Sequence, residues 1–255
     1  MRRFSVFLWL ALAVCARVEA GVMPERTRLV FSQGVGEISL RLANTNDYPV
    51  MVQSWVDQGE GSQAPDTVLS SMFVMPAVLR LQPRAISQVR VLYTGDPLPG
   101  GRESVFWLNL YEIALLPATA PQQDASRLLL GLNTQMKVFY RPPGLPDPGP
   151  QWQDALHFQL RWDERQWVLV CHNDSPYFVS FASLQLSDGT QEFSPRLAPD
   201  QMVPPFGEQR YLLQAETAGA GMPSVWHAPR LRYQMIDDDG RVSDHDIALK
   251  SPPLP

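Results

Sequence analysis

A single lysine inside an apolar run is the first feature that suggests chemistry. Residues 126–142 read SRLLLGLNTQMKVFYRP, with Lys137 near the end, and lysine supplies only 2 of the 21 basic residues of the chain. In an extended strand the alternating leucines lie on one face; they are Leu128, Leu130 and Leu132. The pattern allows either a central strand buried on both faces or an edge strand whose leucines await a partner.

A second cation, Arg28, lies in the apolar run that opens the chain after residue 20. Two cations from strands distant in sequence can converge on one carboxylate and hold it by charge-assisted hydrogen bonds. The alternative is that Arg28 and Lys137 are two ordinary surface charges, and the sequence leaves both interpretations open.

Residue types that catalyse reactions or bind metals form no recognisable constellation. The four histidines share no metal-ligand spacing with a cysteine or carboxylate; they are His157, His172, His227 and His245. The acidic turn 237–240 lacks the alternating ligands and closing glutamate of a calcium loop. Serine elbows, phosphate loops and dinucleotide fingerprints are also missing. We therefore expect a non-enzyme with no catalytic residue, no cofactor and no metal.

The N-terminal segment 1–20 has the pattern of an export signal. Arg2 and Arg3 precede an apolar run, Phe4–Val14, and Ala20 offers a cleavage site before Gly21. A membrane anchor is the alternative, but spanning a bilayer needs roughly 20 apolar residues. We expect cleavage after Ala20 and no membrane insertion afterwards.

Charge and cysteine content exclude further classes. The formal charge of −5 with scattered arginines disfavours nucleic-acid binding, which needs a concentrated basic surface. Cys15 raises a lipoprotein interpretation, but Val14 stands where a small residue would be required. Cleavage would leave Cys171 as the one cysteine, so an exported chain would have no internal disulfide.

Strand periodicity fills the first half of the chain. Alternating or short apolar runs occupy residues 28–31, 38–42, 50–56, 72–76, 78–81, 86–93, 105–113 and 128–140. Such closely spaced strands predict a β-sandwich of immunoglobulin type. Residues 141–150 hold five prolines and two glycines and predict a stiff linker, with a domain boundary near residue 145. The second half repeats the strand pattern and predicts a second, smaller β-sandwich.

Three segments resemble the periplasmic chaperones of the chaperone–usher pilus pathway, the PapD-like family. They are ERTRLVF at 25–31, RESVFWLNL at 102–110 and KVFYRP at 137–142. The resemblance covers almost all of residues 21–146 and weakens afterwards. It implies an all-β protein of two immunoglobulin-like domains in a boomerang arrangement, spanning 21–145 and 146–255, in the periplasm of a Gram-negative bacterium.

The same resemblance implies a binding site. Arg28 and Lys137 would grip the C-terminal carboxylate of a pilus subunit. Leu128, Leu130 and Leu132 would belong to a donor strand near 126–141 that completes a subunit lacking one strand, a mode called donor-strand complementation.

Further residues are implied to have structural roles. Glu103, Arg141 and Asp238 match the interdomain ion network of the family, with Asp237 as the alternative to Asp238. The bond before Pro76 matches a site where the family has a cis peptide.

Two expectations concern the donor strand itself. Lys137 lies an odd number of residues after Leu132, so a flat strand would place the two side chains on opposite faces. We therefore expect a β-bulge or strong twist between them. The loop before the strand, 114–126, is short, which is similar to the family's short-loop subgroup.

The leading hypothesis is a chaperone that binds, folds and caps fimbrial subunits and delivers them to an outer-membrane usher. A free open strand would also allow self-capping by a dimer. The alternative is a structural or adhesive immunoglobulin-like pilus or cell-surface component, in which the strand at 128–140 would be internally paired. A secreted hydrolase on a β scaffold is a third class.

Overall fold

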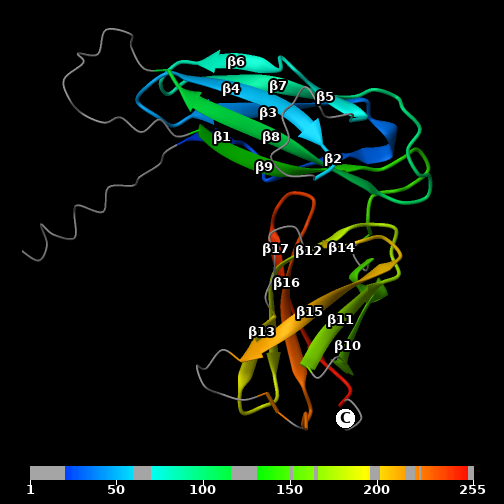
Figure 1. The fold of residues 1–255 in the computed structure, drawn as a ribbon. Helices are drawn as coiled ribbons and strands as arrows, with labels where there is room; N and C mark the ends of the chain where they lie inside the picture. Colours follow the sequence, from blue (N-terminus) through cyan, green and yellow to red (C-terminus); the bar gives the residue numbers. More distant parts are fainter. Residues whose placement is uncertain are drawn as a thin grey trace, which may run out of the picture.

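The computed structural model describes residues 21–59, 70–115, 131–149, 152–163, 166–195, 202–215, 222–223 and 225–251. The expected signal peptide, Leu128, Leu130 and most of the loop before the donor strand lie outside these ranges. Strands form two domains that meet at an angle, with the linker at one side (Figure 1). The all-β, two-domain fold expected from the periodicity is confirmed.

The N-terminal domain is a sandwich of two sheets. The four-stranded sheet has the order β1 (Val22–Pro24), β3 (Glu37–Asn44), β7 (Ile86–Tyr93), β5 (Met72–Met75). The five-stranded sheet has the order β2 (Arg28–Phe31), β9 (Gly131–Tyr140), β8 (Ser104–Ala114), β4 (Val50–Asp57), β6 (Val78–Leu81). The Met75–Pro76 peptide bond between β5 and β6 is cis.

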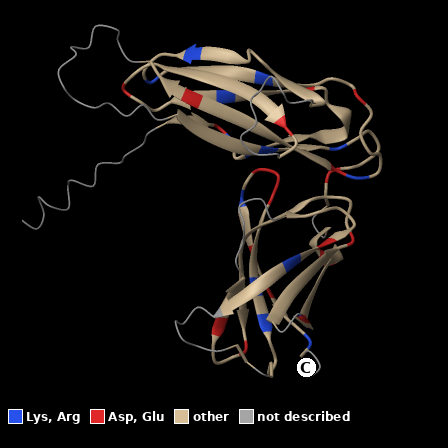
Figure 2. Cartoon of the chain, in the orientation of Figure 1, with Lys and Arg blue, Asp and Glu red and all other residues tan. Residues whose placement is uncertain are grey.

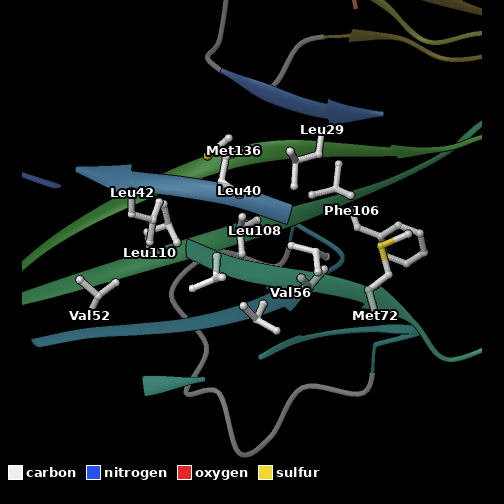
Figure 3. Packing of buried hydrophobic residues seen from close by; sticks show 14 of the residues in the cluster. Leu29, Leu40, Leu42, Val52, Val56, Met72, Phe106, Leu108, Leu110 and Met136 are labelled. Atoms are coloured by element: carbon white, nitrogen blue, oxygen red, sulfur yellow. The ribbon is translucent and has the colours of Figure 1, made fainter. Parts of the chain in front are cut away.

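Alternation of apolar residues along the strands builds the core between the two sheets. Leu40 and Leu42 of β3 face Leu108 and Leu110 of β8, and all four are buried (Figure 3). Successive side chains of a strand point to opposite faces, so one residue in two enters this layer. The intervening residues of β8 and β9 therefore lie on the outer face of the five-stranded sheet.

The first strand region changes sheets. β1 pairs antiparallel with β3, and β2 pairs parallel with β9 in the other sheet. β2 reaches β9 only at residues 137–140, whereas β8 pairs with β9 along its whole length. Within the described chain, residues 131–136 of β9 thus have a backbone partner on one side only.

The C-terminal domain is an eight-stranded β structure. Its strands are β10 (Leu156–Asp163), β11 (Gln166–Asn173), β12 (Val179–Ser187), β13 (Glu192–Pro195), β14 (Met202–Val203), β15 (Gly207–Ala215), β16 (Arg230–Ile236) and β17 (Val242–Ala248). Aromatic rings centre the core, where Trp226 packs edge-on against Trp167 and Phe193. Cys171 is buried in the same core, and burial raises the pKa of its thiol to about 12, so the thiol stays protonated.

Helices contribute little to the described residues. The 3-10 helices η1 (Ser32–Gly34) and η3 (Trp152–Ala155) are single turns. No described helix has the length and apolar character needed to cross a membrane.

Candidate functional site: an interdomain cleft and an open strand edge

The two cations singled out in the sequence lie side by side. Arg28 on β2 and Lys137 on β9 are direct partners in the parallel pairing of the two strands. Neighbouring strands lie about 4.8 Å apart, so both side chains leave the same face of the sheet within reach of one small anion. Arg28 is buried and Lys137 is partly buried.

The guanidinium of Arg28 is incompletely satisfied by the protein. Its Nη1 donates to the carbonyl of Ile236 at 3.3 Å, and its buried Nε has no hydrogen-bond partner in the structure. The ring of Phe139 lies under it, with the centroid 5.9 Å from Cζ. Burial lowers the pKa of Arg28, and nearby acidic groups led by Asp238 oppose this shift. A buried, charged group with an unpaired N–H is suited to bind a carboxylate, because the N–H can donate a hydrogen bond to a carboxylate oxygen.

A cleft between the domains gives an anion access to Arg28. It encloses about 640 Å³ and is lined by β2, by the end of β9, by the linker and by the turn that joins β16 to β17. Figure 2 shows acidic residues at the tip of that turn, facing the N-terminal domain. The cleft thus has a basic wall from one domain and an acidic wall from the other.

Arg141 ties the two domains together at the base of the cleft. Its Nε donates to Glu103 at 2.9 Å, and its Nη1 and Nη2 donate to Asp238 at 2.7 and 2.8 Å. Nη1 also donates to Asp147 at 2.8 Å, a partner in the linker that the sequence reasoning missed. The other oxygen of Glu103 accepts the backbone N–H of Phe178 at 2.7 Å. The three residues expected in the network are therefore in contact.

Asp238, rather than the alternative Asp237, makes this contact. Asp237 accepts the backbone N–H of Arg241 at 2.7 Å and so closes its own turn. In the same turn Gly240 has φ +79°, and a Cβ there would overlap the hydroxyl of Thr27. The turn therefore packs directly against the N-terminal domain.

Burial controls the titration of the network. Desolvation raises the pKa of Glu103 to about 7, although Arg141 and the Phe178 N–H pull it down. The carboxylates around Arg141 raise its pKa in spite of its burial. A guanidinium that is 2 % exposed and surrounded by three carboxylates stays charged.

The open part of β9 carries the exposed leucine. Leu132 is 50 % exposed, although it lies on the same face as the buried Met136 and Val138. At this end of the strand an apolar side chain is thus left half exposed. Leu128 and Leu130 lie outside the described residues.

The expectation of a bulge between Leu132 and Lys137 is wrong. The pairing of β8 with β9 runs without a register shift from Ile113–Gly131 to Ser104–Tyr140. Leu132 and Lys137 therefore lie on opposite faces of a regular strand. The physical reason is that the two residues serve different surroundings: Leu132 continues the core face, and Lys137 lies on the outer face beside Arg28.

A polar network on the outer face holds the open part of β9 against β8. Asn109 is fully buried, and its Oδ1 accepts hydrogen bonds from Asn133 Nδ2 at 3.0 Å and from Gln135 Nε2 at 3.2 Å. Its own Nδ2 donates at 2.7 Å to Asp57, which also accepts the N–H of Gly59. Sequence reasoning did not single out Asn109, although a lone amide inside the apolar run VFWLNL was a usable signal.

Tyr111 covers the first residue of the strand. A Cβ at Gly131 would overlap the hydroxyl and ring of Tyr111, so a larger residue here would force the tyrosine side chain to move. The aromatic ring lies diagonally across the strand pair, where Tyr111 itself pairs with Asn133.

The described ranges offer no metal-binding cluster. No group of three His, Cys, Asp or Glu side chains there is arranged to hold a metal ion. Several of the buried polar groups instead take part in the interdomain network and the Asn109 network.

Comparison with family models matches both halves of the chain. Residues 21–146 match the model described as "Pili and flagellar-assembly chaperone, PapD N-terminal domain". Residues 151–247 match "Pili assembly chaperone PapD, C-terminal domain". The two matches together cover most of the chain, and their junction falls in the proline-rich linker.

Individual proteins give the same result. The chaperone protein FimB/FhaD of Bordetella pertussis is 30% identical over 243 residues, which are 94% of this chain and 91% of the relative. The probable fimbrial chaperone YadV of Escherichia coli is 29% identical over 90% of each chain. The crystal structure of YadV superposes with a TM-score of 0.71 at 26% identity, covering 89% of this chain and 99% of that one. That of the CupB2 chaperone of Pseudomonas aeruginosa gives 0.67 at 29% identity, covering 89% and 100%.

Proposed function

The chain belongs to the PapD family of pilus-assembly chaperones, and we propose that it captures pilus subunits that lack one strand by lending them β9. The observation that carries the proposal is the edge of β9, which has β8 on one side and no described strand on the other at residues 131–136. An exported edge of this kind invites pairing with another chain.

The cation pair sets the register of the bound subunit. A C-terminal carboxylate entering the cleft would meet Arg28 in its lining and Lys137 at the paired position on β9, and its oxygens would satisfy the unpaired N–H of Arg28. With the chain end fixed there, the preceding residues of the subunit extend along the free backbone of β9. Main-chain hydrogen bonds then continue the sheet into the subunit.

The leucines supply the apolar contact. Leu132, and Leu128 and Leu130 ahead of it in the sequence, would insert into the groove that the missing strand leaves in the subunit. Each fully buried leucine contributes about 1.5–3 kcal/mol, so three of them would give much of the binding free energy.

The cellular setting follows from the same assignment. Cleavage of residues 1–20 would release the chain into the periplasm, where it would hold subunits, prevent their edge-to-edge aggregation and pass them to an outer-membrane usher. With no client, the open edge of β9 would allow a second copy of the chain to pair with it as a capped dimer.

A structural or adhesive pilus component is the second candidate. Such a protein would close its own sheets, whereas the described part of β9 leaves an edge open beside a buried cation. The relatives FimB/FhaD and YadV are both named as chaperones, which supports the first assignment.

Capture of a pilus subunit by variants tests the proposal. We expect Arg28→Ala and Lys137→Ala each to lose subunit co-purification from periplasmic extracts while keeping the unfolding midpoint close to wild type. Arg90→Ala is the matched control, since Arg90 is an exposed arginine of the other sheet that pairs with Glu37. Undiminished capture by both folded variants, Arg28→Ala and Lys137→Ala, would refute the anchoring role.

A further inference from the structure

Gly21 lies in a built pocket at the start of β1. The residue is buried, and its backbone N–H donates to Asn46 Oδ1 at 3.0 Å. Its carbonyl accepts both the N–H of Thr45 at 3.0 Å and the hydroxyl of Thr45 at 2.7 Å. A Cβ at this position would lie 3.4 Å from Oε2 of Glu112. The backbone of Gly21 is therefore held on three sides by polar groups.

Glu112 is a buried carboxylate with no arginine or histidine paired to it among the described residues. It is 7 % exposed on β8, and its Oε2 accepts the backbone N–H of Val22. The ion pairs that arginine and histidine side chains form within the described ranges go to other acidic residues. A buried carboxylate without a positive partner is costly, because its lost hydration is not replaced.

We infer that this pocket receives the α-ammonium group of Gly21 that signal cleavage creates. Hydrolysis of the Ala20–Gly21 amide by a signal peptidase consumes one water: Ala20 leaves with a carboxylate and Gly21 keeps its nitrogen as an amine. An α-amino group has an ordinary pKa of about 8, so it is mainly protonated at neutral pH. The new ammonium keeps its hydrogen bond to Asn46 and has further protons to donate to Glu112.

The resulting ion pair would bridge the two sheets of the N-terminal domain. β1 belongs to the sheet of β3, whereas Glu112 belongs to β8 in the opposite sheet. Glu112 is also the direct partner of Leu132, the exposed leucine at the open end of β9. The ion pair thus fixes the end of the sandwich where the open edge begins, and it forms only in the cleaved chain. This inference rests on cleavage before Gly21 and does not depend on subunit binding.

A thermodynamic cycle of four proteins tests the inference. Two versions of the protein are prepared: the Gly21 start, whose first residue is Gly21, and the extended start, which has two added alanines before Gly21. Each version is made with Glu112 and with the substitution Glu112→Gln. In the Gly21 start, Glu112→Gln should raise the unfolding equilibrium constant by about tenfold or more. In the extended start the same substitution should change it by less than about threefold, because the ammonium lies beyond reach of the pocket.

The cycle has one control substitution and one fallback comparison. Glu37→Gln, at an exposed glutamate paired with Arg90, should have the same small effect in both starts. If Glu112→Gln does not fold in the Gly21 start, the two starts with Glu112 intact are compared, and the extended one must be less stable. Equal effects of Glu112→Gln in both starts, equal stability of the two wild-type starts, or an intact mass showing that the exported protein begins at another residue would overturn the inference.

Discussion

Arg28 and Lys137 occupy paired positions on two parallel strands, one at the start and one at the end of the N-terminal domain. Closure of the sandwich brings the two cations together, so the pair exists only in the folded domain. Because the pairing of β2 with β9 stops at this pair, the cations mark the point beyond which β9 has β8 as its one described neighbour. The cation pair and this edge of β9 are therefore adjacent parts of one surface.

The first prediction concerns the chemical group that the cations bind. A client C-terminal peptide with a free carboxylate should bind at least about tenfold more tightly than the same peptide ending in an amide, since charge-assisted hydrogen bonds are lost. Isothermal titration calorimetry measures both peptides. Lys137→Ala should reduce the difference between them, and equal affinity of the two peptides for wild type would contradict an anchor for the chain end.

The second prediction is a pH dependence of stability. Burial raises the pKa of Glu103 from 4.5 to about 7. A raised carboxyl pKa means that the folded state binds the proton more tightly, so its contribution to stability is complete below pH 4.5 and is lost as pH rises through about 7. Urea unfolding between pH 4.5 and 7.5 should show that wild type loses up to roughly 3 kcal/mol relative to Glu103→Gln over this range. A constant difference between the two proteins would contradict it.

The third prediction concerns the contact between the domains. Asp238→Ala removes a bidentate partner of the buried Arg141 and should cost roughly 1–3 kcal/mol. The substitution should also reduce the cooperativity of unfolding, so that the two domains unfold in separate urea transitions. Asp239→Ala is the matched control, because Asp239 pairs with the exposed Arg241 and its loss should change stability by less than about 0.5 kcal/mol. Equal effects of the two substitutions would argue against a special role for Asp238.

The fourth prediction concerns the start of β9. Gly131→Ala places a Cβ into Tyr111 and should destabilise the protein by roughly 1–3 kcal/mol. Gly36→Ala, where an added Cβ meets nothing within 4 Å, should be neutral or slightly stabilising. Thermal unfolding compares the two, and the double variant Gly131→Ala with Tyr111→Ala should cost less than the sum of its parts. Additive effects would show that the ring does not cover the glycine.

Much of the fold could be predicted from the sequence, because alternation along strands of seven or more residues is unambiguous. The run 86–93 gave β7 with its observed bounds. β1 was missed because three residues are too few to show a period. β14 was missed for the same reason, with only two residues.

The site was less predictable because it depends on three-dimensional closure. Lys137 stood out by its rarity, but its position beside Arg28 follows from a parallel pairing that no local pattern reveals. The bulge was expected because the side chains of Leu132 and Lys137 were assumed to lie on the same face of the strand, whereas they lie on opposite faces. Asp147 was hidden in a linker judged only by its prolines.

Hydrogen–deuterium exchange along β9 tests the central claim most directly. In the free protein, alternate backbone amides at 131–136 should exchange quickly, because they point away from β8 toward the open edge, while those at 138–140 are protected by β2. Adding a strand-lacking pilus subunit should slow the fast amides at least about a hundredfold. Amides at 131–136 that are already protected in the free monomer, or that exchange equally fast in the complex, would contradict the donation of β9 to a client.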